Sequence, residues 1–204
     1  MALSIGSAGL VAISSLILSG LWLRSNPEAY FIYIDSASTP PHTAVCLFAL
    51  SVALLLRTFP FNAFWPQDGG VSVILGRWIA AALTIFSLIL CAVSLLQEIS
   101  GLTIGIDHLF PASMNTENTP VIERMSLSAG VSLMVLSGAV FATFFAGRPS
   151  LFIRGAASVF LVPAGFSGIA AWIFSTNPGS LLDQHSDVSV FTSICLSLLG
   201  IAVL

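Results

Sequence analysis

The chain has 204 residues, of which 56% are hydrophobic and only 7% are charged, and its mean hydropathy is +1.00. This composition indicates an integral membrane protein and excludes an ordinary soluble domain. Lysine does not occur, and the six arginines form no basic stripe, which argues against nucleic acid as a partner. The net charge of -3 says little about partners because the charged residues lie at the ends of apolar runs.

Six apolar runs follow one another along the chain, and each reaches or approaches the length needed to cross a hydrocarbon core about 30 Å thick. The first run has no positive n-region and no cleavage site, so we expect a retained helix and not a signal peptide. We predict an all-α, polytopic membrane protein with one transmembrane domain over 1–204. Its six helices would form three hairpins, with bounds of about 4–23, 41–57, 77–97, 125–147, 155–175 and 188–204. The last run lacks a basic anchor, so we expect the chain to continue beyond Leu204.

The arginines are divided unevenly between the predicted loops. Four of them flank the loops at about 57–77 and 148–154, namely Arg57, Arg77, Arg148 and Arg154, whereas most acids fall in the other three loops. Positively charged loops tend to stay in the cytoplasm. We therefore expect both termini in the cytoplasm and the loops at about 25–41, 98–124 and 176–187 on the outer side.

The even-numbered helices repeat one another. Alignment of PHTAVCLFALSVALL from Pro41, LSAGVSLMVLSGAVF from Leu127 and VFTSICLSLLGIAVL from Val190 brings Ser51, Ser137 and Gly200 into register. The pattern predicts three repeats of a helix, an outer loop and a returning helix.

The loop between the third and fourth helices holds the charged residues with the most evident local role. Asp107 lies in a phrase that we expect to fold back onto the membrane surface, and Arg124 opens a helix where a cation opposes the helix dipole. Pairing of Arg124 with Asp107 or Glu98 would fix the loop over the hairpin. Together with His108, these residues are candidates for ligand binding, although a fixed loop without a ligand is the simpler explanation.

Two phrases in and after this loop, Gly105 to Phe110 in SLLQEISGLTIGIDHLF and Arg124 to Ser126 in ERMS, resemble the multi-helix membrane input regions of bacterial sensor histidine kinases and diguanylate cyclases. The resemblance also takes in Pro41, Thr43, Ala44 and Ser51, which match a Pro-x-Thr-Ala phrase followed by a small residue. It departs at 127–130, where the family usually shows Pro-Asn-Thr-Ala. The resemblance implies a sensory domain in the bacterial cytoplasmic (inner) membrane, with a signalling output domain fused downstream or in a partner chain.

Histidine and cysteine residues recur near the outer side of the predicted bundle. Each outer loop region has one histidine, and three helices have a cysteine at a similar depth; the set is His42, His108, His185, Cys46, Cys91 and Cys195. Imidazole and thiolate together suit copper or zinc, so a soft-metal or redox site is one reading. The other is that buried cysteine simply packs as a small apolar residue and that the histidines are solvated.

The predicted spans contain no acid or base, which disfavours ion-coupled transport, and no paired histidines at a depth suited to haem. No serine or cysteine has a recognisable base nearby in sequence, so we expect no enzymatic activity and no cofactor. The sequence therefore favours a sensory, signal-transduction input domain embedded in the lipid bilayer, and a homodimer is compatible with it. The alternative is a small transporter or an accessory membrane subunit of a larger complex.

Overall fold

A computed structural model describes residues 2–23, 40–58, 70–101, 113–114, 120–121, 125–145, 147–175 and 189–204. Within these ranges the chain is helical apart from one small β-ladder, which confirms the all-α class. The helices are α1 (Ala2–Leu23), α2 (Pro41–Thr58), α3 (Gly70–Ser100), α4 (Leu127–Ala142), α5 (Arg148–Ser175) and α6 (Val190–Val203). Strands β1 (Ser113–Met114) and β2 (Pro120–Val121) pair antiparallel between α3 and α4.

Two helices begin earlier than the sequence predicts. Helix α3 begins at Gly70 and not at 77, because the apolar residues after Gly70 continue the helix and Arg77 lies exposed on its side. Helix α5 begins at Arg148 and not at 155. Gly147, with φ of 141°, lies directly before the helix, and Pro149 lies in the first helical turn, where its missing N–H costs nothing.

Helix α4 is shorter than predicted. It begins after Ser126, whose side chain accepts a hydrogen bond from the Ala129 N–H, and it ends at Ala142. The residues after Ala142 turn toward α5, held by hydrogen bonds from the N–H groups of Thr143 and Phe144 to preceding carbonyls. The predicted bounds 125–147 thus included the N-cap and the following turn.

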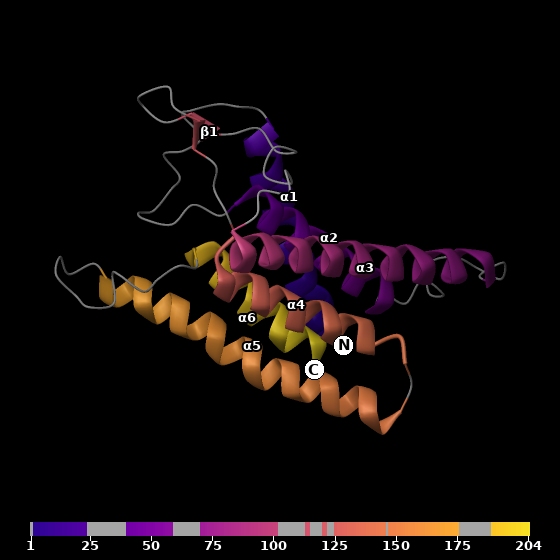
Figure 1. Cartoon of the computed structure of the whole chain (residues 1–204). Coiled ribbons are helices and arrows are strands. Elements are labelled where there is room, and N and C mark those ends of the chain that lie inside the picture. The colour runs from indigo at the N-terminus through magenta and orange to yellow at the C-terminus, as the bar shows by residue number, and fades with distance from the viewer. Residues whose placement is uncertain are drawn as a thin grey trace.

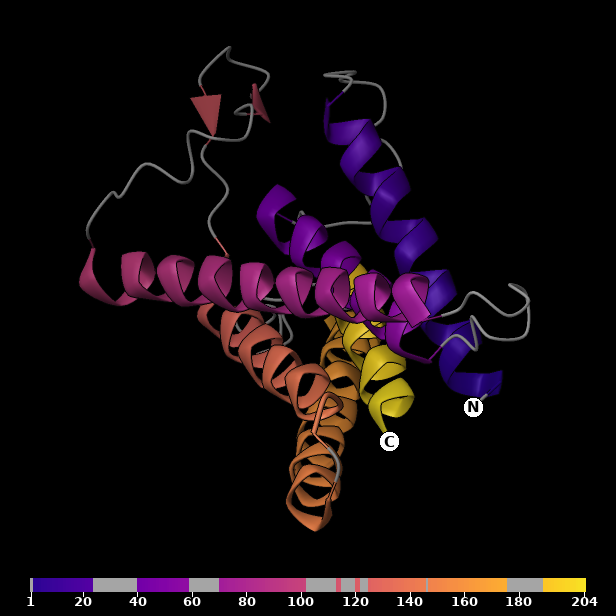
Figure 2. The same ribbon diagram turned by 90° about the vertical axis from the view of Figure 1, so that its right-hand side faces the viewer.

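The six helices form a closed ring. Each helix packs against the next one along the chain, and α1 packs against α6, so that the first and last helices complete the ring. The even-numbered helices α2, α4 and α6 also contact one another across the centre. Figure 1 shows α3, α4 and α5 running back and forth across the view, with β1 beyond the end where α3 stops and α4 starts. Figure 2, turned by 90°, shows α3 running across the view, with α1 passing the start of α3 at a steep angle.

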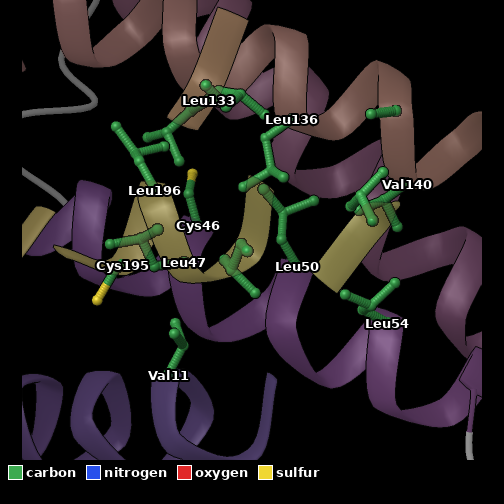
Figure 3. Packing of buried hydrophobic residues seen from close by; sticks show 14 of the residues in the cluster. Val11, Cys46, Leu47, Leu50, Leu54, Leu133, Leu136, Val140, Cys195 and Leu196 are labelled. Carbon is green, nitrogen blue, oxygen red and sulfur yellow. The ribbon is translucent and has the colours of Figure 1, made fainter. Parts of the chain in front are cut away.

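The centre of the ring is built from equivalent positions of the three even-numbered helices. Leucines and valines of the three helices meet there, at most 2% exposed: Leu47, Leu50 and Leu54 of α2, Leu133, Leu136 and Val140 of α4, and Leu196, Leu199 and Val203 of α6. Figure 3 shows most of these side chains gathered together. The alignment of the repeat places the same residues in register, so the packing agrees with the predicted threefold repeat.

The starts of the same helices are also in register. Pro40, Ser126 and Ser189 each offer the backbone carbonyl that accepts the first helical hydrogen bond, from the N–H of Ala44, Gly130 and Ser193 respectively. Ser126 and Ser189 share nearly identical extended backbone angles and cap their helices with the side chain. Serine is a favoured N-cap because its oxygen satisfies an otherwise unpaired N–H.

Helices α5 and α6 approach each other most closely where glycine leaves room. A Cβ added at Gly165 would lie 2.5 Å from the Ser193 carbonyl oxygen and 2.9 Å from the Ser197 nitrogen. Further along the interface, the Ser158 hydroxyl donates a hydrogen bond of 2.7 Å to the Gly200 carbonyl. Small residues and hydroxyl-to-carbonyl bonds are the usual means by which helices pack in lipid.

Two arginines tie neighbouring helices together through backbone carbonyls. Arg57, in the last turn of α2, donates from Nε and Nη2 to the Thr143 carbonyl after α4, at 3.2 and 3.1 Å. Arg154 of α5 donates to the carbonyls of Val203 and Leu204 at the end of α6, at 2.8 and 3.1 Å. A cation is favourable at a helix C-terminus because the last carbonyls lack partners and concentrate negative charge.

Two segments within the described residues are long and apolar enough to cross a membrane, by length and composition: Ile74–Ser100 and Arg148–Ala171. Both segments have mostly exposed side chains. In an 18-residue stretch of each, 33% of the residues are buried in the first segment and 22% in the second. The other four helices contribute shorter apolar segments of 10–17 residues.

Candidate functional site

The predicted loop-fixing residues are only partly covered by the structure. Asp107, His108 and Arg124 lie outside the described residues. Glu98 is exposed in the last turn of α3, two residues before the end of the helix. The predicted pairing of Arg124 with Asp107 or Glu98 therefore stays a prediction.

The six histidines and cysteines of the predicted metal site are only partly covered by the structure. His108 and His185 lie outside the described residues, whereas His42, Cys46, Cys91 and Cys195 are buried. Among the residues that the structure describes, no three His, Cys, Asp or Glu side chains are grouped so that they could hold a metal ion. A site with three or more such ligands would need residues beyond the described ranges.

Two of the three cysteines meet between α2 and α3. The Cys91 Sγ lies 3.7 Å from the Cys46 Sγ, within hydrogen-bonding distance for thiols, and the Cys46 Sγ lies 4.0 Å from the Ser87 carbonyl oxygen. Both side chains are fully buried, and neither cysteine forms a disulfide. The similar depth of these cysteines along their helices was predicted from the sequence, but their pairing required the register between α2 and α3.

Cys195 occupies the equivalent place in the repeat but has a different neighbour. It aligns with Cys46 and lies on α6, where its thiol interacts with the Ser14 hydroxyl of α1. In Figure 3 the sulfur of Cys195 points toward α1, and that of Cys46 points to the other side. The fold thus gives one pair of thiols and one separate thiol.

Polar groups surround the thiol pair on both helices. His42 lies one helical turn before Cys46 and is 2% exposed. Thr43 and Ser87 are fully buried, and their hydroxyl oxygens have no hydrogen-bond partner within the described part of the chain. Thr84, one turn before Ser87, donates to the Ala80 carbonyl at 2.8 Å. This interface is the most polar part of the described interior that lacks full hydrogen bonding.

Small residues line the first turns of α2, α4 and α6. The sequence places Ala44, Ala129, Gly130 and Ser193 there, and all four are buried. A Cβ added at Gly130 would lie 2.7 Å from Leu95 Cδ2, so Leu95 of α3 fills the space beside this glycine. The small residues at this point serve the close approach of α3 and α4.

The sequence did not predict the two arginine anchors. Arg57 and Arg154 appeared only as markers of cytoplasmic loops, whereas the structure assigns each to the carbonyls of a neighbouring helix end. The sequence did contain a signal for these contacts, because each arginine lies within about two turns of a helix end.

Comparison of the chain with protein-family models, curated proteins and solved structures found no match.

Proposed function

We propose that the chain is a six-span membrane protein of the bacterial cytoplasmic membrane, with both termini in the cytoplasm. The exposed faces of α3 and α5 support it most strongly. Trp78 is 72% exposed and Phe152 is 78% exposed, and apolar residues dominate the same faces of both helices. Soluble proteins rarely expose apolar patches of this extent, whereas lipid would cover them at no cost.

The described arginines support the proposed orientation. Arg57 at the end of α2, Arg77 near the start of α3 and Arg148 at the start of α5 belong to the ends that the alternating helices bring to one side of the ring. An excess of arginine on one side is typical of the cytoplasmic face.

Within the membrane we propose a sensory input function that passes a signal to a cytoplasmic output domain, fused downstream or in a partner chain. The resemblance of Gly105 to Phe110 and of Arg124 to Ser126 to bacterial input regions is the observation that supports this role. Leucines fill the described centre of the ring, which favours sensing over the alternative of a small transporter with a central path. An accessory membrane subunit remains the second alternative.

Orientation is tested by labelling a single cysteine. In a variant with Cys46, Cys91 and Cys195 replaced by alanine, Asn118→Cys should react with a membrane-impermeant maleimide added to whole cells. Labelling only after the cytoplasmic side is opened would contradict the orientation. A second cysteine at Gly147 is the matched control, because we expect its labelling only from the cytoplasm.

Signalling is tested separately, with the catalytic domain of a diguanylate cyclase fused after Leu204 in cells that lack other cyclases. Asp107→Asn and Arg124→Ala should change the cyclic dinucleotide level at equal amounts of membrane-inserted protein. Substitution of a lipid-facing residue, Val159→Leu, is the control. Output that is unaffected by every outer-loop substitution would contradict a sensory role and leave the topology unaffected.

A further inference from the structure

The Cys46 and Cys91 thiols are close enough to react with each other. Their sulfurs are separated by 3.7 Å, and a disulfide requires about 2.05 Å. They belong to different helices far apart in the sequence, so a bond between them would join α2 to α3 covalently. Cys195 has no cysteine beside it in the described structure and provides an internal comparison.

The helices that carry these thiols are joined less completely than α5 and α6. At the α5–α6 interface the buried Ser158 hydroxyl donates across to the Gly200 carbonyl, while the hydroxyls of Ser193 and Ser197 donate to carbonyls within α6. Beside the thiols, the buried hydroxyl of Ser87 has no partner within the described residues. An unsatisfied buried hydroxyl costs about 1–3 kcal/mol, so separation of α2 from α3 is opposed less strongly there than separation of α5 from α6.

The surroundings of the pair determine which oxidants can reach it. Neither Cys46 nor Cys91 is exposed to solvent. On α3, however, Phe86 and Ile89 flank Ser87 and are exposed on the outside of the ring, where the proposed membrane placement puts lipid. A reactant dissolved in the bilayer therefore lies one helix face away from the thiols.

We propose that Cys46 and Cys91 form a redox-active dithiol that a lipid-soluble quinone oxidises to an α2–α3 disulfide. Two S–H bonds break and one S–S bond forms. The two electrons and two protons pass to the quinone, which becomes the hydroquinone, and the reverse reaction restores both thiols. The inference rests on the proposed membrane placement and deepens the sensory role, because it makes the redox state of the membrane quinones the stimulus.

The consequence for the fold is local. The disulfide would fix the separation and register of α2 and α3 at the polar part of their interface. Because α2 also contacts α4 and α6 across the centre, a change in its position would be passed to both of these helices.

The experiment counts free thiols in the full chain embedded in lipid nanodiscs. The bilayer contains a fully ring-substituted benzoquinone, which cannot form thioethers. After exposure the protein is denatured and alkylated, and its mass is measured. We expect the number of alkylated cysteines to fall from three to one, with the loss of one equivalent of quinone absorbance, and to return to three after a dithiol reductant. Oxidised glutathione in the aqueous phase should leave all three free.

Three variants decide which thiols react. In Cys195→Ser, quinone treatment should lower the number of alkylated cysteines from two to none. In Cys46→Ser and in Cys91→Ser, both remaining cysteines should still be alkylated. Three free cysteines after quinone treatment, or loss of thiols in Cys46→Ser, would overturn the pair. Oxidation by hydrogen peroxide without any oxidation by the quinone would overturn the choice of oxidant. A disulfide that forms without any change in the output of the cyclase fusion would contradict only the sensory role.

Discussion

Arg57 of α2 holds the carbonyl of Thr143 at the end of α4 with two hydrogen bonds, from Nε and Nη2, across the cytoplasmic end proposed for the ring. The guanidinium thus joins two of the three helices that form the centre. The Thr143 hydroxyl donates to the Val140 carbonyl at 2.6 Å, so the same turn is fixed by its own side chain as well. This contact is the most direct link between the first and second repeats at that end.

Removal of the guanidinium should weaken the protein measurably. Hydrogen bonds to charged groups contribute about 1.5–3 kcal/mol, and partial exposure of Arg57 places the expected loss for Arg57→Ala near the lower limit. Arg57→Lys should recover only part of it, because one ammonium cannot reproduce the planar pair of donors. Thermal unfolding in detergent measures both. Arg77→Ala, at an exposed position on α3, is the control. An equal loss of stability in this variant would show that Arg57 has no special role.

The close contact of α5 and α6 predicts a large effect for one added methyl group. Gly165→Ala would press a Cβ against the backbone of Ser193 and Ser197, and overpacking of this kind costs about 1–3 kcal/mol. Gly138→Ala is a matched control in α4, since nothing lies within 4 Å of its added Cβ. Alanine is favoured over glycine in a helix by up to about 1 kcal/mol, so this variant should be slightly more stable. If a thermal unfolding assay showed that both variants change stability in the same direction, the close contact at Gly165 would be refuted.

The threefold repeat predicts equal effects at equivalent leucines. Leu47→Ala, Leu133→Ala and Leu196→Ala each remove a side chain that is at most 2% exposed at the centre of the ring. Each should cost about 2–5 kcal/mol, the range measured for buried leucine. Leu151→Ala, at a position 61% exposed on α5, should cost much less. If one of the three central variants were as stable as Leu151→Ala, the three helices would not contribute equally to the centre.

A double-mutant cycle tests the pairing predicted for the loop between α3 and α4. Arg124→Ala and Asp107→Asn should each lower stability, because removal of one partner leaves the other charge without compensation. If the two groups are in contact, the double variant should differ from the sum of the single variants by about 0.5–3 kcal/mol. Additive effects would show that the two groups act independently, and Glu98→Gln would then be the next variant to combine with Arg124→Ala.

The sequence predicted the helical class and the equivalence of α2, α4 and α6, because both depend on the pattern of apolar and small residues. It failed at the start of α3, where Gly69, Gly70 and Arg77 look like the end of a loop. The helix continues there because Arg77 can lie on an exposed face with its apolar stem along the helix. Apolar runs cannot distinguish a helix that ends at the membrane surface from one that extends past it.

The partners of the candidate site residues were less predictable. Depth along a helix follows from counting residues, and it placed Cys46, Cys91 and Cys195 at a common level. Which two of them meet depends on the rotation of each helix about its axis, and that rotation is set by contacts such as Gly130 against Leu95. The carbonyl partners of Arg57 and Arg154 depend on the same register and on helix ends that shift by several residues from the predicted bounds.

The contact of α1 with α6 also determines the order in which the molecule can be assembled. Ser14 belongs to α1 and Cys195 to α6, so their contact cannot form until α6 has left the ribosome. The α1–α2 and α3–α4 hairpins can pair during synthesis, since their helices are neighbours in sequence. Until α6 arrives, α1 has one face without its final neighbour, and the ring remains open on that side. We therefore expect the nascent chain to be most vulnerable to membrane proteases in this interval, and least so once α6 has closed the ring.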